Sequence, residues 1–285
     1  MTDRSPSTHL VTALDLPFRF LRDKFPAYAP TVGVLTAACL AANVVQAFLM
    51  EGFVADPEDP LRLYRSPLPM LGMGLQFSVM GVAATARAVC VANALAGRDT
   101  SLAACFAPLL RPRLWAPLLA AAGIVGIHLM CCCYGASILL LPLGLILPAA
   151  LDEGLGLRAI ARSVEVSMWK VGPDFFDRPG WKVVAVRLAE YLVTMALGSM
   201  AAIPMFFVMG GAMWEAIASG HPELVTQSMQ NIPMWVTMSM GILGTLFGVF
   251  PAIYGSAATF QIYRDAVARH DGADLERLIA EKPVG

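Results

Sequence analysis

Charged residues are scarce in this chain, and their scarcity is the first guide to its structure. Asp, Glu, Lys and Arg make up 14% of the 285 residues, whereas an average soluble domain contains about 25%. Hydrophobic residues make up 57%. Long stretches carry no charge, and the basic residues gather between them, which is the pattern that a bilayer imposes. The composition therefore predicts a polytopic membrane protein.

The sequence also lacks features typical of nucleic-acid binding, of a cleaved leader or of catalysis. Basic and acidic residues nearly balance, at 20 and 21, and no basic run is interleaved with aromatics. Residues 1–30 contain no apolar core of signal-peptide length, so we expect the first span to act as an uncleaved insertion signal. No phosphate loop, paired-carboxylate cleft or Ser/His/Asp signature appears. We therefore predict no nucleic-acid partner, no cofactor and no catalytic residue.

Six apolar stretches are long enough to cross a bilayer as helices, which takes about 20 residues. They lie at about 31–50, 69–96, 114–132, 134–151, 183–214 and 233–263. Pro26 and Pro30 precede the first of them, and Pro204 and Pro251 should kink the last two. The predicted fold class is an all-α polytopic membrane bundle of about six transmembrane helices, with residues 31–263 as a single membrane domain.

Two segments outside the spans have the pattern of helices that lie along the membrane surface. In the cytoplasmic arm, residues 1–30, apolar side chains alternate with Arg19, Arg22 and Lys24. In the surface segment 152–182, apolar residues recur at three- and four-residue steps beside a basic face. These residues are Leu157, Ile160, Val164 and Met168. Both patterns predict interfacial amphipathic helices. A shorter surface helix is expected over 102–113, and 264–285 form a cytoplasmic tail.

The basic residues predict the side of the membrane on which each connection lies, because positively charged loops resist translocation. Six spans place sixteen Lys and Arg on one side, in the arm, after the second span, in the surface segment and in the tail. Only Arg62 and Arg65 lie on the other side. We therefore predict a multi-pass protein of the bacterial inner membrane with both termini in the cytoplasm.

Four ionisable residues inside the predicted spans are candidate functional positions, since such groups are costly in a bilayer. They are Arg87, His128, Arg187 and Glu190. Arg87 is about 15 Å from the cytoplasmic end of its span, within reach of a partner or of the headgroups. Arg187 and Glu190 are three residues apart, a spacing that favours an ion pair. We favour structural roles, because a proton or ion pathway would need more such groups.

His128 is followed by Cys131, Cys132 and Cys133, which together offer nitrogen and sulfur ligands to a soft metal. Adjacent helical residues point about 100° apart, and a structural zinc site draws paired ligands from separated segments. The favoured interpretation is therefore helix packing by small cysteines, with no metal predicted. Metal or haem redox chemistry stays open as an alternative.

Two segments resemble a known bacterial group. Residues 148–163 are similar to a "Pro … Glu-Gly … Ala … Arg-Ser" stretch after the fourth helix of that group. Residues 263–275 resemble its "Tyr-x-Asp-x-Arg-x-x-x-Gly-x-Asp-Leu" ending, except that the arginine after the Asp is displaced in this chain. The 97–102 turn has a counterpart too. The group contains the membrane domains attached to some glycerophosphodiester phosphodiesterases and many stand-alone six-helix proteins. The resemblance implies a six-helix architecture but no catalytic residue, because the phosphodiesterase domain is absent.

The first of these segments supplies candidate residues at the cytoplasmic interface: Glu153, Arg158, Arg162 and Ser163. Glu at a helix start suits the helix dipole, and Arg can meet lipid phosphate. A structural role is the simpler interpretation.

Three functions remain open at this point. The leading one is a non-enzymatic integral membrane protein that acts as a scaffold, accessory subunit or lipid-contacting factor, with membrane lipids, another membrane protein or a second copy as partners. The second is a transporter of a small solute or lipid, motivated by Arg87, the kinking prolines and the Gly-rich second and sixth spans. The third is the redox protein built on His128.

Overall fold

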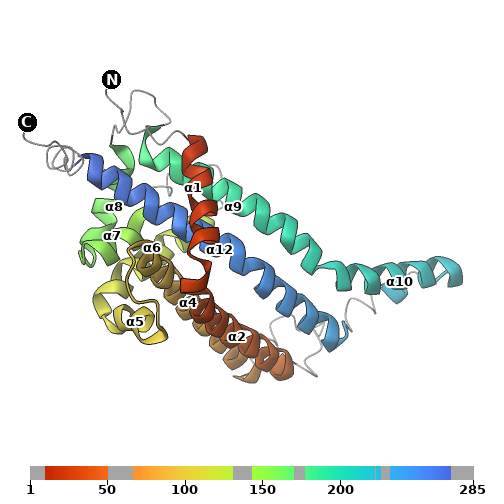
Figure 1. The fold of residues 1–285 in the computed structure, drawn as a ribbon. Helices are drawn as coiled ribbons and strands as arrows, with labels where there is room; N and C mark the ends of the chain where they lie inside the picture. The colour runs from red at the N-terminus through yellow and green to blue at the C-terminus, as the bar shows by residue number, and fades with distance from the viewer. Residues whose placement is uncertain are drawn as a thin grey trace, which may run out of the picture. The chain divides into compact units, whose positions relative to one another are not determined.

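The computed structural model is all-helical over the residues that it describes, which are 10–50, 67–130, 143–169, 177–221, 223–225 and 232–270, and it has no strand among them (Figure 1). This confirms the all-α fold class. Among the described residues, four helices are long and apolar enough to cross a membrane: α2 (Phe25–Met50), α4 (Pro67–Leu95), α9 (Pro179–Ala201) and α12 (Met234–His270). The chain thus has the character of a multi-pass membrane protein.

The six-span count stays a prediction. The stretch 114–132 corresponds to α6 (Pro112–Met130), which is not among these four helices. Of the stretch 134–151, residues 134–142 lie outside the described part of the chain. Its remainder forms a 3-10 turn at 143–145 and the short helix α7 (Ile146–Asp152).

The fifth predicted span is two helices, because α9 ends at Ala201 and α10 (Ile203–Ser219) begins after Ala202 (Figure 1). Pro204 accounts for the break. Proline lacks the backbone N–H donor, and its ring collides with the carbonyl four residues earlier, so it is best accommodated in the first turn of a helix. The sequence analysis expected a kink at Pro204 within one helix, whereas the helix is interrupted there.

The first and last spans are longer than predicted. Helix α2 begins at Phe25 rather than at residue 31, with Pro26 in its first turn, where the missing N–H has no helical partner to lose. Helix α12 continues through Pro251 and past residue 263 to His270. Polar residues after 263 therefore extend the helix instead of ending it.

The predicted surface segments are helical. They are α1 (Leu10–Asp23), α5 (Leu102–Phe106) with the 3-10 helix η1 (Ala107–Leu110), and α8 (Arg158–Met168). In α8, the small residues Ala159, Ser163 and Ser167 are buried. The predicted apolar face is instead largely outward, since Leu157 and Met168 are each 61% exposed and Val164 is 41% exposed.

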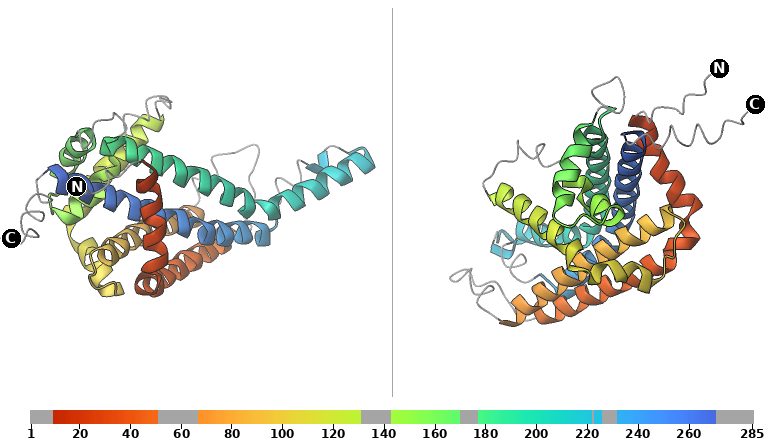
Figure 2. Two further views of the ribbon diagram at one scale, coloured as in Figure 1. Left: turned by 45° about the horizontal axis from the view of Figure 1, so that its top comes forward. Right: turned by 90° about the vertical axis from the view of Figure 1, so that its left-hand side faces the viewer.

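Contacts divide the chain into two compact units. Unit 1 comprises Met1–Ala29, Ala88–Glu190 and Ile253–Gly285, and unit 2 comprises Pro30–Arg87 and Tyr191–Ala252. Unit 1 joins segments that are distant in sequence. The Thr100 hydroxyl donates to the Ala27 carbonyl at 2.6 Å, and the Tyr254 hydroxyl donates to the Leu14 carbonyl at 3.1 Å. The two views of Figure 2 show α7 and α8 beside the C-terminal part of α12.

In unit 2, hydrogen bonds between uncharged side chains and backbone groups join separate helices. The buried Asn43 of α2 donates to the Gly241 carbonyl at 3.1 Å and to the Thr245 hydroxyl at 2.5 Å, both on α12. Gln76 of α4 donates to the Asn43 side-chain oxygen. One amide thus links three helices.

Candidate functional site

Four arginines line one cavity of about 650 Å³ in unit 1, which we call the arginine cavity. Its charged residues are Arg98, Arg111, Arg113, Arg264 and Asp152. Apolar residues from α4, α6 and α7 complete part of the lining, among them Val89, Leu114 and Leu151. The cavity therefore combines a strong positive charge with an apolar surface.

Arg98 is placed by the end of α4. Gly97 adopts a left-handed conformation, with φ of 64°, that residues with a side chain rarely adopt. The Arg98 amide donates to the Asn93 carbonyl at 2.8 Å, and the Gly97 amide donates to the Ala94 carbonyl at 3.2 Å. These two bonds form a Schellman motif, which ends the helix and turns the chain sharply. Arg98 consequently lies at the cavity immediately after the last turn of α4.

The next turn is fixed by a carboxylate. Asp99 accepts hydrogen bonds from the Ser101 amide at 2.9 Å and the Ser101 hydroxyl at 2.7 Å, and both bonds hold the pKa of Asp99 below its usual value. The same hydroxyl accepts from the Ala104 amide and caps α5. This local network holds the segment that follows Arg98.

Arg111 and Arg113 flank the start of α6. A residue before proline favours extended backbone, and Arg111 has φ of −91° and ψ of 118°. Pro112 then opens α6, a position where its missing N–H costs nothing. The N-terminal end of a helix carries a partial positive charge that attracts anions. The Arg-Pro-Arg sequence thus brings two guanidinium groups and a helix start to the same cavity.

Arg264 of α12 is held by Asp152 at the end of α7. Its Nε and Nη2 atoms donate to the two carboxylate oxygens at 2.7 and 2.8 Å, a two-pronged geometry typical of strong pairs. Nη2 also donates to the Ala92 carbonyl at 3.5 Å. The pair fixes the Arg264 side chain beside the cavity.

The predicted interface residues Glu153 and Arg162 lie in a second cluster of unit 1. Arg162 Nε donates to both Glu153 oxygens at 3.1 Å, and its Nη1 donates to Glu165 at 3.4 Å. The Tyr263 hydroxyl also donates to Glu153. Burial lowers the pKa of Arg162, but the Glu153 carboxylate and further hydrogen bonds outweigh it, so the pKa is raised. These contacts tie α7 and α8 to α12.

Aromatic rings close this cluster on one side. The Trp169 and His270 rings stack at 3.6 Å between centroids, and the Arg162 guanidinium lies 4.8 Å from the Trp169 ring centroid. Ser163 is fully buried, whereas Arg158 is exposed. Because Arg162 is committed to Glu153 and Trp169, its geometry favours a structural role over contact with lipid phosphate.

The intramembrane candidates are dispersed. Arg187 and Glu190 form the ion pair that their spacing predicts, at 2.5 Å. Arg87 donates to the Ala83 carbonyl of its own helix at 3.3 Å and lines neither of the two cavities described for unit 1. His128 falls in α6, but its side chain and Cys131, Cys132 and Cys133 lie outside the described residues. Among the described residues, no group of three metal-ligating side chains occurs.

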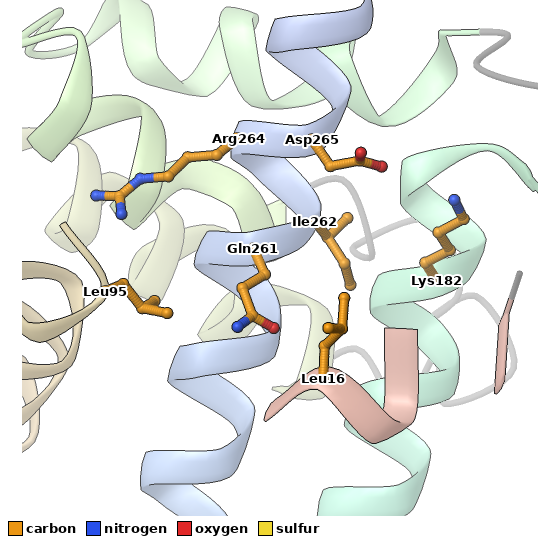
Figure 3. Close-up of a pocket in the computed structure, with 7 residues that line it drawn as sticks. All are labelled: Leu16, Leu95, Lys182, Gln261, Ile262, Arg264 and Asp265. Carbon is orange, nitrogen blue, oxygen red and sulfur yellow. The ribbon is translucent and has the colours of Figure 1, made fainter. Parts of the chain in front are cut away.

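A smaller pocket of about 300 Å³ lies on α12, between residues of α1, α4 and α9 (Figure 3). Gln261, Arg264 and Asp265 come from α12, and Lys182 of α9 is only 4% exposed. Asp265 and Asp177 attract the Lys182 ammonium group. Arg264 lines both this pocket and the arginine cavity.

The sequence analysis missed the arginine cavity. It counted Arg98, Arg111, Arg113 and Arg264 only as charges that set the orientation of the chain. The Gly97 turn and the Arg-Pro-Arg sequence were the available signals, because each places an arginine directly at a helix end. Their convergence depends on the packing of α4, α6, α7 and α12, which no local pattern reveals.

Comparisons with known proteins give no relative: no family model, no curated protein and no solved structure matches the chain.

Proposed function

We propose that the chain is a multi-pass protein of the bacterial inner membrane that binds anionic lipid headgroups through unit 1, which faces the cytoplasm. The observation that carries this proposal is the arrangement of α8. Its small residues pack against the protein, while Leu157, Val164 and Met168 are exposed beside basic segments. Such a face suits the boundary between headgroups and acyl chains, where apolar side chains enter lipid and basic ones meet phosphate.

Other parts of unit 1 support the same location. Phe18 of α1 and Phe25 at the start of α2 are 48% and 58% exposed, and Arg19 and Arg22 are exposed on α1. The described parts of all four segments with predicted cytoplasmic charges belong to this unit. Sixteen basic residues against two on the opposite side of a six-span layout favour the cytoplasm.

We also propose that the chain shares the six-helix architecture of the membrane domains of glycerophosphodiester phosphodiesterases, which it resembles in sequence. Of the three functions left open by the sequence, a lipid-contacting factor agrees best with the exposed apolar face. The transporter remains an alternative; Arg87, which motivated it, belongs to unit 2 and donates to the Ala83 carbonyl of its own helix.

The proposal is tested by the lipids that the purified full-length chain retains. The protein is extracted from nanodiscs of equal phosphatidylglycerol and phosphatidylcholine, and bound lipids are counted by native mass spectrometry. We expect preferential retention of phosphatidylglycerol. Nanodiscs in which phosphatidylserine replaces phosphatidylglycerol keep the net negative charge and change the headgroup, so they separate charge from headgroup chemistry. Equal retention of the anionic and zwitterionic lipids would contradict the proposal.

A further inference from the structure

We infer that the arginine cavity is a discrete site for one phosphate group carried on an organic backbone. If the group belongs to a lipid, the inference deepens the proposed function and rests on it for the membrane location. The chemistry of the site itself rests only on the residues of the cavity.

Three of the four cavity arginines differ from most arginines of the described chain in that they are not paired with a carboxylate. Five described arginines elsewhere contact carboxylates at 2.5 to 3.1 Å, namely Arg19, Arg22, Arg162, Arg187 and Arg269. In the described residues, Arg98, Arg111 and Arg113 have no carboxylate within ion-pair distance. Guanidinium groups match phosphate oxygens with two parallel N–H donors. Three arginines thus line one cavity, and among the described residues none of the three is paired with a carboxylate.

The fourth arginine is already oriented. Asp152 engages Nε and Nη2 of Arg264, and Nη1 takes no part in those bonds. The four arginines and the single aspartate give the lining a formal charge of +3. The start of α6 adds the positive end of a helix dipole. An anion entering the cavity meets an arginine of α12 that Asp152 orients, together with the arginines that follow α4 and flank the start of α6.

The size and remaining lining of the cavity indicate what carries the phosphate. A volume of about 650 Å³ falls within the range of small-molecule sites, roughly 300–1,000 Å³, and exceeds the needs of inorganic phosphate. Val89, Leu114 and Leu151 offer apolar surface to a carbon skeleton. A phosphomonoester with a glycerol-sized backbone fits both features, whether it is the headgroup of phosphatidic acid or a free metabolite.

The experiment compares two probes on the full-length protein. One is glycerol phosphate, which is phosphatidic acid without its acyl chains, measured by calorimetry in detergent. The other is phosphatidic acid in phosphatidylcholine nanodiscs, measured by native mass spectrometry. The variants are Arg111→Gln and Arg113→Gln. Arg158→Gln is the matched control, because Arg158 is an exposed arginine of the same unit outside the cavity.

We expect each cavity variant to weaken binding about tenfold, the loss typical of one charge-assisted hydrogen bond, and the control to bind as the wild type does. Unchanged melting temperatures show that the variants fold. Loss confined to phosphatidic acid identifies a lipid ligand, and loss for glycerol phosphate identifies a soluble one; either result supports the site.

The site is overturned if the wild type binds neither probe or if Arg158→Gln weakens binding as much as the cavity variants do. Selective retention of phosphatidylglycerol in the earlier experiment would then still support the proposed function without the site. Conversely, binding of glycerol phosphate with no preference for anionic lipid would support the site and reject the lipid role.

Discussion

Unit 1 and unit 2 use different chemistry to join distant parts of the chain. In unit 1, charged pairs link separate elements, such as Asp152 with Arg264 and Glu153 with Arg162. In unit 2, the neutral amide of Asn43 links α2 to α4 and α12. Ion pairs suit regions that water can reach, whereas a charge in hydrocarbon is costly and an amide is far less so. The contrast agrees with the proposal that unit 1 meets water and headgroups.

We expect the largest effect from removing an ion pair that joins two elements of unit 1. Asp152→Ala leaves Arg264, whose side chain is 31% exposed, without its carboxylate, so we expect a loss of about 3 kcal/mol of unfolding free energy. Asp15→Ala is the control, because the Asp15–Arg19 pair is exposed on one helix and contributes at most about 0.5 kcal/mol. Thermal unfolding in detergent measures both. Equal losses would show that Asp152 does not join elements.

A second prediction compares two glycines of α9, one in each unit. A Cβ at Gly180 would lie 2.8 Å from the Ser167 carbonyl oxygen, whereas nothing described lies within 4 Å of one at Gly198. Gly180→Ala should cost about 2 kcal/mol through overpacking, and Gly198→Ala should gain up to about 1 kcal/mol through helix propensity. Melting temperatures check the opposite signs. A neutral Gly180→Ala would mean that α8 and α9 pack less closely than the structure has them.

These contacts mark the limit of what the sequence predicts. Apolar runs predicted α2, α4, α9 and α12, because the tendency of a predominantly apolar helix to enter lipid depends mainly on composition. The periodicity of Leu157, Val164 and Met168 predicted α8 and an apolar face on it. The i, i+3 spacing predicted the Arg187–Glu190 pair. The break at Ala202 was missed, since Pro204 permits either a kink or a new helix start.

The arginine cavity could not be predicted from the sequence, for a different reason. Asp152 and Arg264 are 112 residues apart in sequence, and Arg98 and Arg111 belong to different turns. Nothing local indicates that they share a cavity. Helix-end signals place each arginine, but only tertiary packing brings the arginines together.

A third prediction, with a smaller expected effect, concerns the hydrogen bonds that the Asn43 amide makes in unit 2. Asn43→Ala removes the shared amide and should cost about 1 kcal/mol, since hydrogen bonds between membrane helices contribute modestly. Thr36→Ala on the same helix is the control, because the Thr36 hydroxyl bonds only within α2, to the Val32 carbonyl. Unfolding in denaturing detergent compares the two. A larger loss for Thr36→Ala would contradict a role for Asn43 in joining helices.

The smallest expected effect concerns pH. Hydrogen bonds from Ser101 lower the pKa of Asp99, so this carboxylate stabilises the fold above its unfolded pKa of about 3.9. That contribution is lost as pH falls through the lower, folded-state pKa. Asp99→Asn should therefore melt below the wild type at pH 7, and the difference should shrink on acidification to pH 3. A difference that is constant with pH would contradict this origin.

The central claim, that the exposed face of α8 lies among anionic lipids, is tested most directly by quenching. A fluorophore is attached at Val164→Cys in a variant without other reactive cysteines, and the protein is reconstituted with spin-labelled phosphatidylglycerol or phosphatidylcholine at equal amounts. We predict quenching by both lipids, stronger with phosphatidylglycerol, and protection from aqueous iodide. Efficient iodide quenching without lipid quenching would contradict the account.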